Sequence, residues 1–418
     1  MPHLVAKLWW VLLANIIVLG KLAISGRLEC DFPAIYNFGD SNSDTGGISA
    51  AFLPLPWPNG QNFLKKPSGR YSDDRLILDL IDIGGIYVAY QSLSWPNGET
   101  SFKNSFGRYS DGRLIVDFFA EKLGIPYLSA YLNSLGANYS HGTNFATGGS
   151  TIRQPNETIF ENGISPFSLD IQIAQYDQFK SRSKDLYGNP MIRSMLPKEE
   201  VFSKALYTFD IGQNDLGVAF RTMNNDDQIR ADIPNIIDQF SSAVQNLYKK
   251  GARFFWIHNT GPIGCIPDST GSITPQPGTL DQYGCIKSQN DIANEFNKQL
   301  SDAVLKLGTE LPKAALTYVD VYTAKYGLIS QAANLGWEDP TKLCCGYLEK
   351  DGRVWCGRKG LVNNGSVVYG GACSQPERYV SWDGIHYTEA ANHWFANLII
   401  NGSLSDPPNP ITYACYRD

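Results

Sequence analysis

The chain has 418 residues, of which 43% are hydrophobic, and its formal net charge is −6. This length and apolar content suffice for a sizeable core in one large domain or two small ones. An acidic balance argues against nucleic acid as a main partner, because phosphate binding requires clustered Lys and Arg side chains.

Residues 1–25 are typical of a secretory signal peptide. Lys7 precedes an apolar run over residues 8–20, and small residues follow before an expected cleavage near Ser25 or Gly26. A membrane anchor is the alternative, but this run is short for a span of about 20 residues. No later segment is apolar enough to span a bilayer, so we expect no stable membrane insertion.

Eight cysteines follow the expected cleavage site. Their even number is typical of disulfides in an oxidising compartment. A zinc site is the alternative, but adjacent cysteines lack the C-x-x-C ligand spacing, so we predict no metal. Eight cysteines allow 105 pairings, and the sequence does not choose among them. The cysteines are Cys30, Cys265, Cys285, Cys344, Cys345, Cys356, Cys373 and Cys415.

Four N-x-S/T sequons support a secreted, extracellular protein. They predict glycosylation at Asn138, Asn156, Asn364 and Asn401.

Five short apolar runs, rich in β-branched and aromatic residues, predict buried parallel strands. Segments with helical periodicity lie between or after them, which implies an α/β sheet with helices on both faces. No Pro/Gly/Ser-rich linker divides the chain, so we predict one domain over residues 26–418, with a Cys- and Gly-rich loop region at 337–378. The expected strands are 34–38, 143–147, 205–211, 252–258 and 314–320.

Ligands of open parallel sheets bind outside the carboxyl ends of the strands. Ser41 follows the first strand in "FGDSNSDTGG". A serine hydroxyl becomes a useful nucleophile only beside a base. The alternative is an ordinary turn in which Asp and Ser side chains bond the backbone.

His386 is the strongest candidate for that base among five histidines. Asp383 precedes it by three residues in "SWDGIHYTEA", where a carboxylate could hold the imidazole tautomer and stabilise its charged form. The alternative is a helix N-terminus capped by Thr388. His3 leaves with the signal peptide, and His141 precedes the second strand. His258 is expected to be a core or edge histidine, and His393 to have a surface or packing role.

An acyl-transfer site also needs donors for a developing oxyanion. Candidates are the backbone N–H groups of Ser41 and Gly149 and the side-chain amide of Asn214, with Gly148 as the substitute if the glycine register shifts by one. Each could instead be a simple turn residue. All of them follow predicted strands at one edge of the sheet.

The blocks "FGDSNSDTGG", "NFATGGST", "GQND" and "SWDGIHYTEAAN" resemble, in order, the four blocks of the GDSL, or SGNH, hydrolases. The phrases "WIHNTGPIGC" and "GRYSDGRLIVDF" resemble the plant secreted GDSL esterase/lipases, and the resemblance covers nearly the whole chain after residue 25. It implies a three-layer α/β/α sandwich with about five parallel strands in flavodoxin-like order. It also implies Ser41 as nucleophile, Gly149 and Asn214 as oxyanion donors, and Asp383 with His386 completing the triad, without a cofactor.

This resemblance implies a secreted carboxylic ester hydrolase that forms an acyl-enzyme. Lipid esters, acetylated glycosides and cell-wall acetyl esters all stay open as substrates. We expect a monomer in the apoplast or cell wall, with a small-molecule, glycan or lipid ester as its partner.

Two alternatives have other chemistry. A glycosidase would need two carboxylates facing one sugar bond, and Asp40, Asp44, Asp215 and Asp383 offer acids. A catalytically impaired glycoprotein is the other, because the chain carries an unusual duplication near Ser41.

The duplication begins with "WPNG" at Trp57 and again at Trp95, 38 positions later. Each copy continues through "GRYSD" into a helical pattern with paired apolar residues on one face. The second copy continues as the family does. We therefore expect it to fill the native position, and we expect residues 53–90 to be an extra surface segment.

Deletion of residues 53–90 should leave a folded protein, because the second copy retains every element of the motif. Circular dichroism and thermal unfolding of the purified variant check this. A variant lacking the second copy is the matched comparison. Unfolding of the first variant together with normal folding of the second would reverse the assignment.

Overall fold

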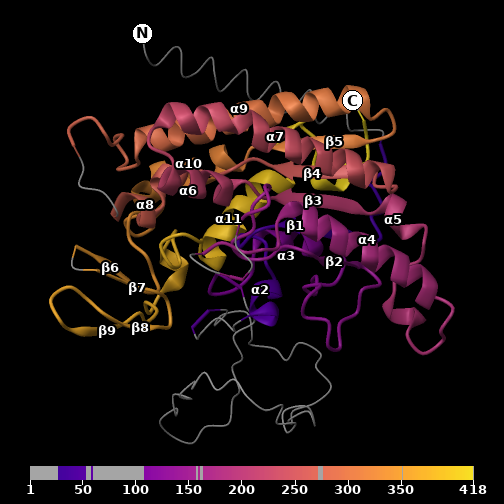
Figure 1. Cartoon of the computed structure of the whole chain (residues 1–418), viewed down its shortest axis with the longest axis horizontal. Helices are drawn as coiled ribbons and strands as arrows, with labels where there is room; N and C mark the ends of the chain where they lie inside the picture. Colours follow the sequence, from indigo (N-terminus) through magenta and orange to yellow (C-terminus); the bar gives the residue numbers. More distant parts are fainter. Residues whose placement is uncertain are drawn as a thin grey trace, which may run out of the picture.

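The five predicted strands form one parallel sheet in the computed structural model. They are β1 (Ile35–Gly39), β2 (Gly142–Asn144), β3 (Leu206–Asp210), β4 (Phe254–His258) and β5 (Ala315–Val319). Their order in space is β5-β4-β3-β1-β2, which confirms the flavodoxin-like prediction (Figure 1). A sixth strand, β10 (Ser405–Asp406), pairs antiparallel with β5. It was not predicted, because two residues are too few for a periodic pattern. The structure describes residues 27–52, 58–59, 108–156, 159–160, 163–271, 276–350 and 352–417.

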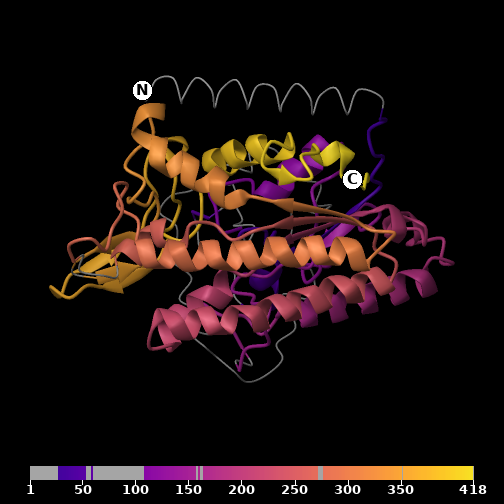
Figure 2. The ribbon, with the colours of Figure 1, turned by 90° about the horizontal axis from the view of Figure 1, so that it is seen from above.

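Helices cover both faces of the sheet, as predicted (Figure 2). One layer contains α4 (Leu169–Leu186), α7 (Asp226–Lys249) and α9 (Lys287–Glu310), and the other contains α3 (Ile115–Lys122), α10 (Val321–Gln331) and α11 (Glu389–Ile400). Shorter helices are α2 (Gly47–Ala51), α5 (Val201–Lys204), α6 (Gln213–Thr222) and α8 (Pro267–Gly271). Short 3-10 turns span Arg193–Met195, Ile263–Cys265, Ala332–Leu335, Pro376–Arg378 and Ile411–Tyr413.

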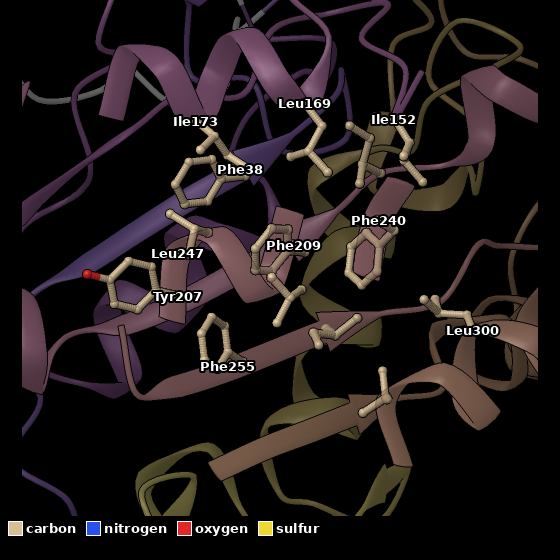
Figure 3. Packing of buried hydrophobic residues seen from close by; sticks show 14 of the residues in the cluster. Phe38, Ile152, Leu169, Ile173, Tyr207, Phe209, Phe240, Leu247, Phe255 and Leu300 are labelled. Carbon is tan, nitrogen blue, oxygen red and sulfur yellow. The ribbon is translucent and has the colours of Figure 1, made fainter. Parts of the chain in front are cut away.

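Successive side chains along each strand point to opposite faces of the sheet, so they pack into two core clusters, one under each helix layer. In β1, Tyr36 and Phe38 pack in the cluster with α4, α7 and α9, whereas Ile35 packs in the cluster with α3, α10 and α11. Figure 3 shows the first cluster, in which Phe38, Phe209 and Phe240 fill the space between sheet and helices. Because both faces are buried, the strands are almost wholly apolar in sequence.

The region 337–378 is not a plain loop. It contains two hairpins, β6 (Tyr347–Glu349) with β7 (Gly352–Val354), and β8 (Lys359–Leu361) with β9 (Val367–Tyr369). Strands of three residues give no readable alternation, which explains why the sequence did not predict them. Both hairpins lie beside the main sheet in Figure 1, and we call the region 337–378 that contains them the Cys-rich arm.

All eight cysteines form disulfides, as predicted, and two of the four bridges lie in the Cys-rich arm. The pairs are Cys30–Cys415, Cys265–Cys285, Cys344–Cys373 and Cys345–Cys356. The expected signal peptide lies outside the described residues. Within the described part of the chain, no helix is both long and apolar enough to cross a membrane.

The second copy of the duplicated motif supplies α3. Its paired apolar residues Leu114, Ile115, Phe118 and Phe119 are all buried against the sheet and α11. Of the segment 53–90, the structure describes only Pro58 and Asn59, and both are buried rather than on the surface. The rest of that segment lies outside the described residues, so its placement stays a prediction.

A buried ion pair anchors the start of α3. The Arg108 guanidinium donates to both carboxylate oxygens of Asp117, at 3.2 and 2.9 Å, and the backbone N–H of Leu114 donates to the same carboxylate at 2.9 Å. Both charged side chains are almost fully buried. Removing one partner would leave the other charge uncompensated in the interior.

Asp117→Ala should therefore lower the free energy of unfolding by about 3–5 kcal/mol. Urea denaturation measures this change. Asp302→Ala is the matched control, because it removes an exposed pair with Lys298 and should cost no more than about 0.5 kcal/mol. Equal losses in the two variants would contradict the argument.

Candidate active site

Ser41 and His386 meet although they lie 345 positions apart. Ser41 follows β1 directly, and His386 lies in the loop before α11. The Ser41 Oγ atom is 2.7 Å from His386 Nε2, and both residues are buried apart from a small exposed fraction. The structure thus brings the predicted nucleophile and base into hydrogen-bond contact.

Asp383 holds the other side of the imidazole. Its Oδ2 lies 2.7 Å from His386 Nδ1, and its Oδ1 accepts the backbone N–H groups of Ile385 and His386. Burial alone would raise the pKa of Asp383, but the His386 charge and these hydrogen bonds lower the pKa to about 2. This lowered pKa stabilises the fold fully above about pH 4, and the contribution is lost as the pH falls through about 2.

The loop around Asp383 is fixed by the Cys-rich arm. The Trp382 N–H donates to the His386 carbonyl at 2.8 Å, and the Cys345 N–H donates to the Trp382 carbonyl. The indole of Trp382 donates to Asn59 Oδ1 at 3.0 Å. Arg353 pairs with Asp268 and approaches the Asp383 carbonyl. Contacts from the arm and from Asn59 therefore hold the loop that carries the carboxylate and the imidazole.

The glycine pair after β2 differs in its backbone contacts. The Gly148 N–H donates to Asp44 at 2.8 Å, whereas the N–H groups of Gly149 and Ser41 have no hydrogen-bond acceptor among the described residues. Gly149 has a φ of +80°, and a Cβ there would lie 2.4 Å from the Gly163 carbonyl oxygen. Only glycine fits this position, and its N–H rather than that of Gly148 is available to a ligand.

Asn214 lies at the start of α6, at the same edge of the sheet. Its amide donates to Asp40 Oδ2 at 3.2 Å and to the Ser150 carbonyl at 2.9 Å. Both amide hydrogens are thus engaged in this structure. An oxyanion would have to share one of them, and the longer bond to Asp40 is the weaker one.

A set of buried charges lies behind Ser41. Burial and the neighbouring Asp210 charge raise the pKa of Asp40 to about 8. His258 lies 3.2 Å from Asp210 and outweighs the effect of burial, so that the pKa of Asp210 is lowered. Burial lowers the pKa of Lys325. His258 is buried, as expected for a core histidine, and its partner is Asp210 rather than Ser41.

Two residues make contacts at the site that the sequence did not indicate, although Asp44 was named there as a possible glycosidase acid. Asp44 accepts the N–H groups of Gly46, Gly47 and Ile48, besides that of Gly148, and so ties the two loops together. Tyr109 packs on the ring of His386. The only sequence signal for the role of Asp44 was its position before "TGG". No sequence signal predicted the contact between Tyr109 and His386, because the two residues are distant in the chain.

The remaining predicted histidines and sequons lie away from this centre. His393 packs on Phe118, and His141 is exposed and contacts the Pro33 carbonyl. The four sequon asparagines, Asn138, Asn156, Asn364 and Asn401, are all exposed. The described residues contain no group of three or more His, Cys, Asp or Glu side chains suited to a metal ion. A cavity of about 410 Å³ between α4 and α5 contacts none of Ser41, Asp383 and His386.

Comparison with known proteins identifies the same family by a family model and by individual relatives. Residues 35–399 match the family described as GDSL-like lipase/acylhydrolase. A GDSL esterase/lipase of Arabidopsis thaliana is 54% identical over 412 residues, covering 98% of this chain and 95% of the relative. A GDSL esterase/lipase of Zea mays is 44% identical, covering 93% and 90%. A protein named alpha-L-fucosidase 3, from Arabidopsis thaliana, is 42% identical, covering 90% and 91%.

Asp383→Asn should lower kcat for a short-chain ester by about 10⁴-fold, because an amide favours the wrong imidazole tautomer and cannot stabilise its charged form. Hydrolysis of p-nitrophenyl acetate measures this effect. Asp339→Asn is the control, because this exposed carboxylate bonds only within its own turn. A kcat of Asp383→Asn within tenfold of the wild type would contradict the assignment.

Proposed function

Because the chain belongs to the GDSL-like lipase/acylhydrolase family and is an ester hydrolase, we propose that Ser41 is its nucleophile. The observation that carries this proposal is the continuous contact from Ser41 Oγ through His386 to Asp383, at 2.7 Å in each step. In this arrangement His386 Nε2 accepts the serine proton while Nδ1–H donates to the carboxylate.

Ester cleavage would take place in two stages. Ser41 Oγ attacks the carbonyl carbon, His386 takes its proton, and the same proton passes to the departing alcohol. Water then attacks the acyl-enzyme, with His386 again taking and returning a proton. The lowered pKa of Asp383 supports this cycle, because the carboxylate stays ionised wherever the imidazole must carry charge.

The oxyanion would bind to the N–H groups of Ser41 and Gly149. The lack of any other acceptor for them among the described residues supports this role. Asn214 would supply a third donor through the hydrogen that now contacts Asp40. The raised pKa of Asp40 supports this, because a neutral carboxyl group accepts that hydrogen less strongly than a carboxylate.

A glycosidase is the second candidate, favoured by the name of one relative. It would need two carboxylates directed at one sugar bond. Asp44 is held by four backbone N–H groups, Asp215 by those of Ile152 and Arg153, and Asp383 by His386. Asp40, the fourth candidate acid, accepts hydrogen bonds from Asn42 and Asn214. Since all four acids already bind protein groups, ester hydrolysis is the function that the site supports best.

The same proposal extends to location and substrate. Four disulfides fit an oxidising compartment of the secretory pathway, and the exposed sequons fit an extracellular glycoprotein of the apoplast or cell wall. An ester of a small molecule, glycan or lipid is the proposed substrate, and a monomer is the proposed form.

Ser41→Ala should abolish hydrolysis of p-nitrophenyl acetate, with a loss in kcat of about 10⁶-fold, because no other nucleophile replaces the serine oxygen. A fluorophosphonate probe should label the wild type at Ser41 and leave the variant unlabelled. Ser43→Ala is the control, because Ser43 lies in the same loop as Ser41 and accepts a hydrogen bond from Asn37 of β1 without contacting His386. Equal activity in wild type and Ser41→Ala would exclude Ser41 as nucleophile.

A further inference from the structure

Tyr109 lies against the imidazole of His386. The two ring centroids are 4.5 Å apart and the ring planes are inclined by 35°. Tyr109 belongs to the "GRYSDGR" stretch of the second copy, just before α3, and it is only partly buried. The cycle proposed above uses none of its atoms as a reactant, so the contact needs another explanation.

The backbone around Tyr109 is fixed on both sides. Arg108 is held in its buried pair with Asp117 of α3. The Asp111 carboxylate accepts the N–H of Glu389, at 2.7 Å, in the first turn of α11. Tyr109 lies just before α3, and His386 lies just before α11. Since these two helices pack together, both residues are held by the same rigid unit.

The tyrosine ring has little room to move away from the imidazole. A Cβ at Gly148 would lie 2.5 Å from Tyr109 Cε2 and 2.9 Å from its hydroxyl oxygen, so the ring fills the space over this glycine. The ring is therefore confined between the imidazole on one side and the glycine loop on the other.

The hydroxyl group is not what holds the ring. It has no hydrogen-bond partner among the described residues. Burial, with the charges of Asp44 and Asp383, raises the pKa of Tyr109 far above its ordinary value, so the phenol stays neutral. The contact with His386 thus depends on the shape of the aromatic ring.

We infer that Tyr109 is a positioning residue whose ring holds the His386 imidazole in line between Ser41 and Asp383. The imidazole is bonded at Nδ1 and Nε2, and both bonds depend on its orientation. Packing against one face opposes its rotation, and small displacements of a catalytic group can reduce rates by about 10²-fold. This inference rests on the proposed serine-esterase function.

The test compares Tyr109→Phe, which keeps the ring, with Tyr109→Leu, which keeps an apolar side chain without the ring. Tyr109→Leu should lower kcat for p-nitrophenyl acetate about 10- to 100-fold with KM changed less than about threefold, whereas Tyr109→Phe should stay within about threefold in both. Tyr71→Leu is the matched control, because Tyr71 occupies the same motif position in the first copy, and it should behave as wild type.

Labelling with a fluorophosphonate probe separates positioning from substrate binding. This reaction needs Ser41 activated by His386 but no bound ester, so its rate in Tyr109→Leu should fall by the same factor as kcat. Thermal unfolding of each variant gives its folded fraction, and each measured rate is divided by that fraction.

If the probe labels the wild type and labels Tyr109→Leu at the same rate, the role of Tyr109 is overturned but the esterase function is not. Equal losses in Tyr109→Phe and Tyr109→Leu would overturn it as well, because the hydroxyl would then carry the effect. A wild type that the probe does not label would overturn the esterase function itself.

Discussion

One hydrogen bond, between Ser41 Oγ and His386 Nε2, connects the first strand of the sheet to the loop before the last long helix. The serine end is fixed by β1, a wholly buried strand that is paired on both sides, with β3 and with β2. The imidazole end has no such strand. It depends on Asp383, on the Cys-rich arm and on the packing of α3 against α11.

Several carboxyl groups are buried near the Ser41–His386 hydrogen bond. A carboxylate in the interior is costly unless hydrogen bonds or an opposite charge compensate it. His258 compensates Asp210, whose pKa is lowered, whereas burial raises the pKa of Asp44 despite its backbone hydrogen bonds and raises that of Asp40 to about 8. The charged groups near Ser41 are therefore held in fixed positions by hydrogen bonds and ion pairs of the fold.

The sequence predicted the parts of this structure that depend on local pattern. Apolar runs identified all five parallel strands, and the spacing of Asp383 and His386 identified one half of the site. Parts that depend on contacts between distant residues were harder to predict. The packing of Tyr109 on His386, the disulfide pairing and the three-residue strands of the Cys-rich arm leave no periodic trace in the sequence.

The bridge between Cys30 and Cys415 spans 385 positions and so joins nearly the two ends of the described chain. Its sulfur atoms close the polypeptide into a covalent ring. A protease that cuts one exposed loop would open this ring without releasing a fragment, and the two halves would stay linked beside their common sheet. Because the bridge joins them, the two ends of the described chain cannot fray independently of each other.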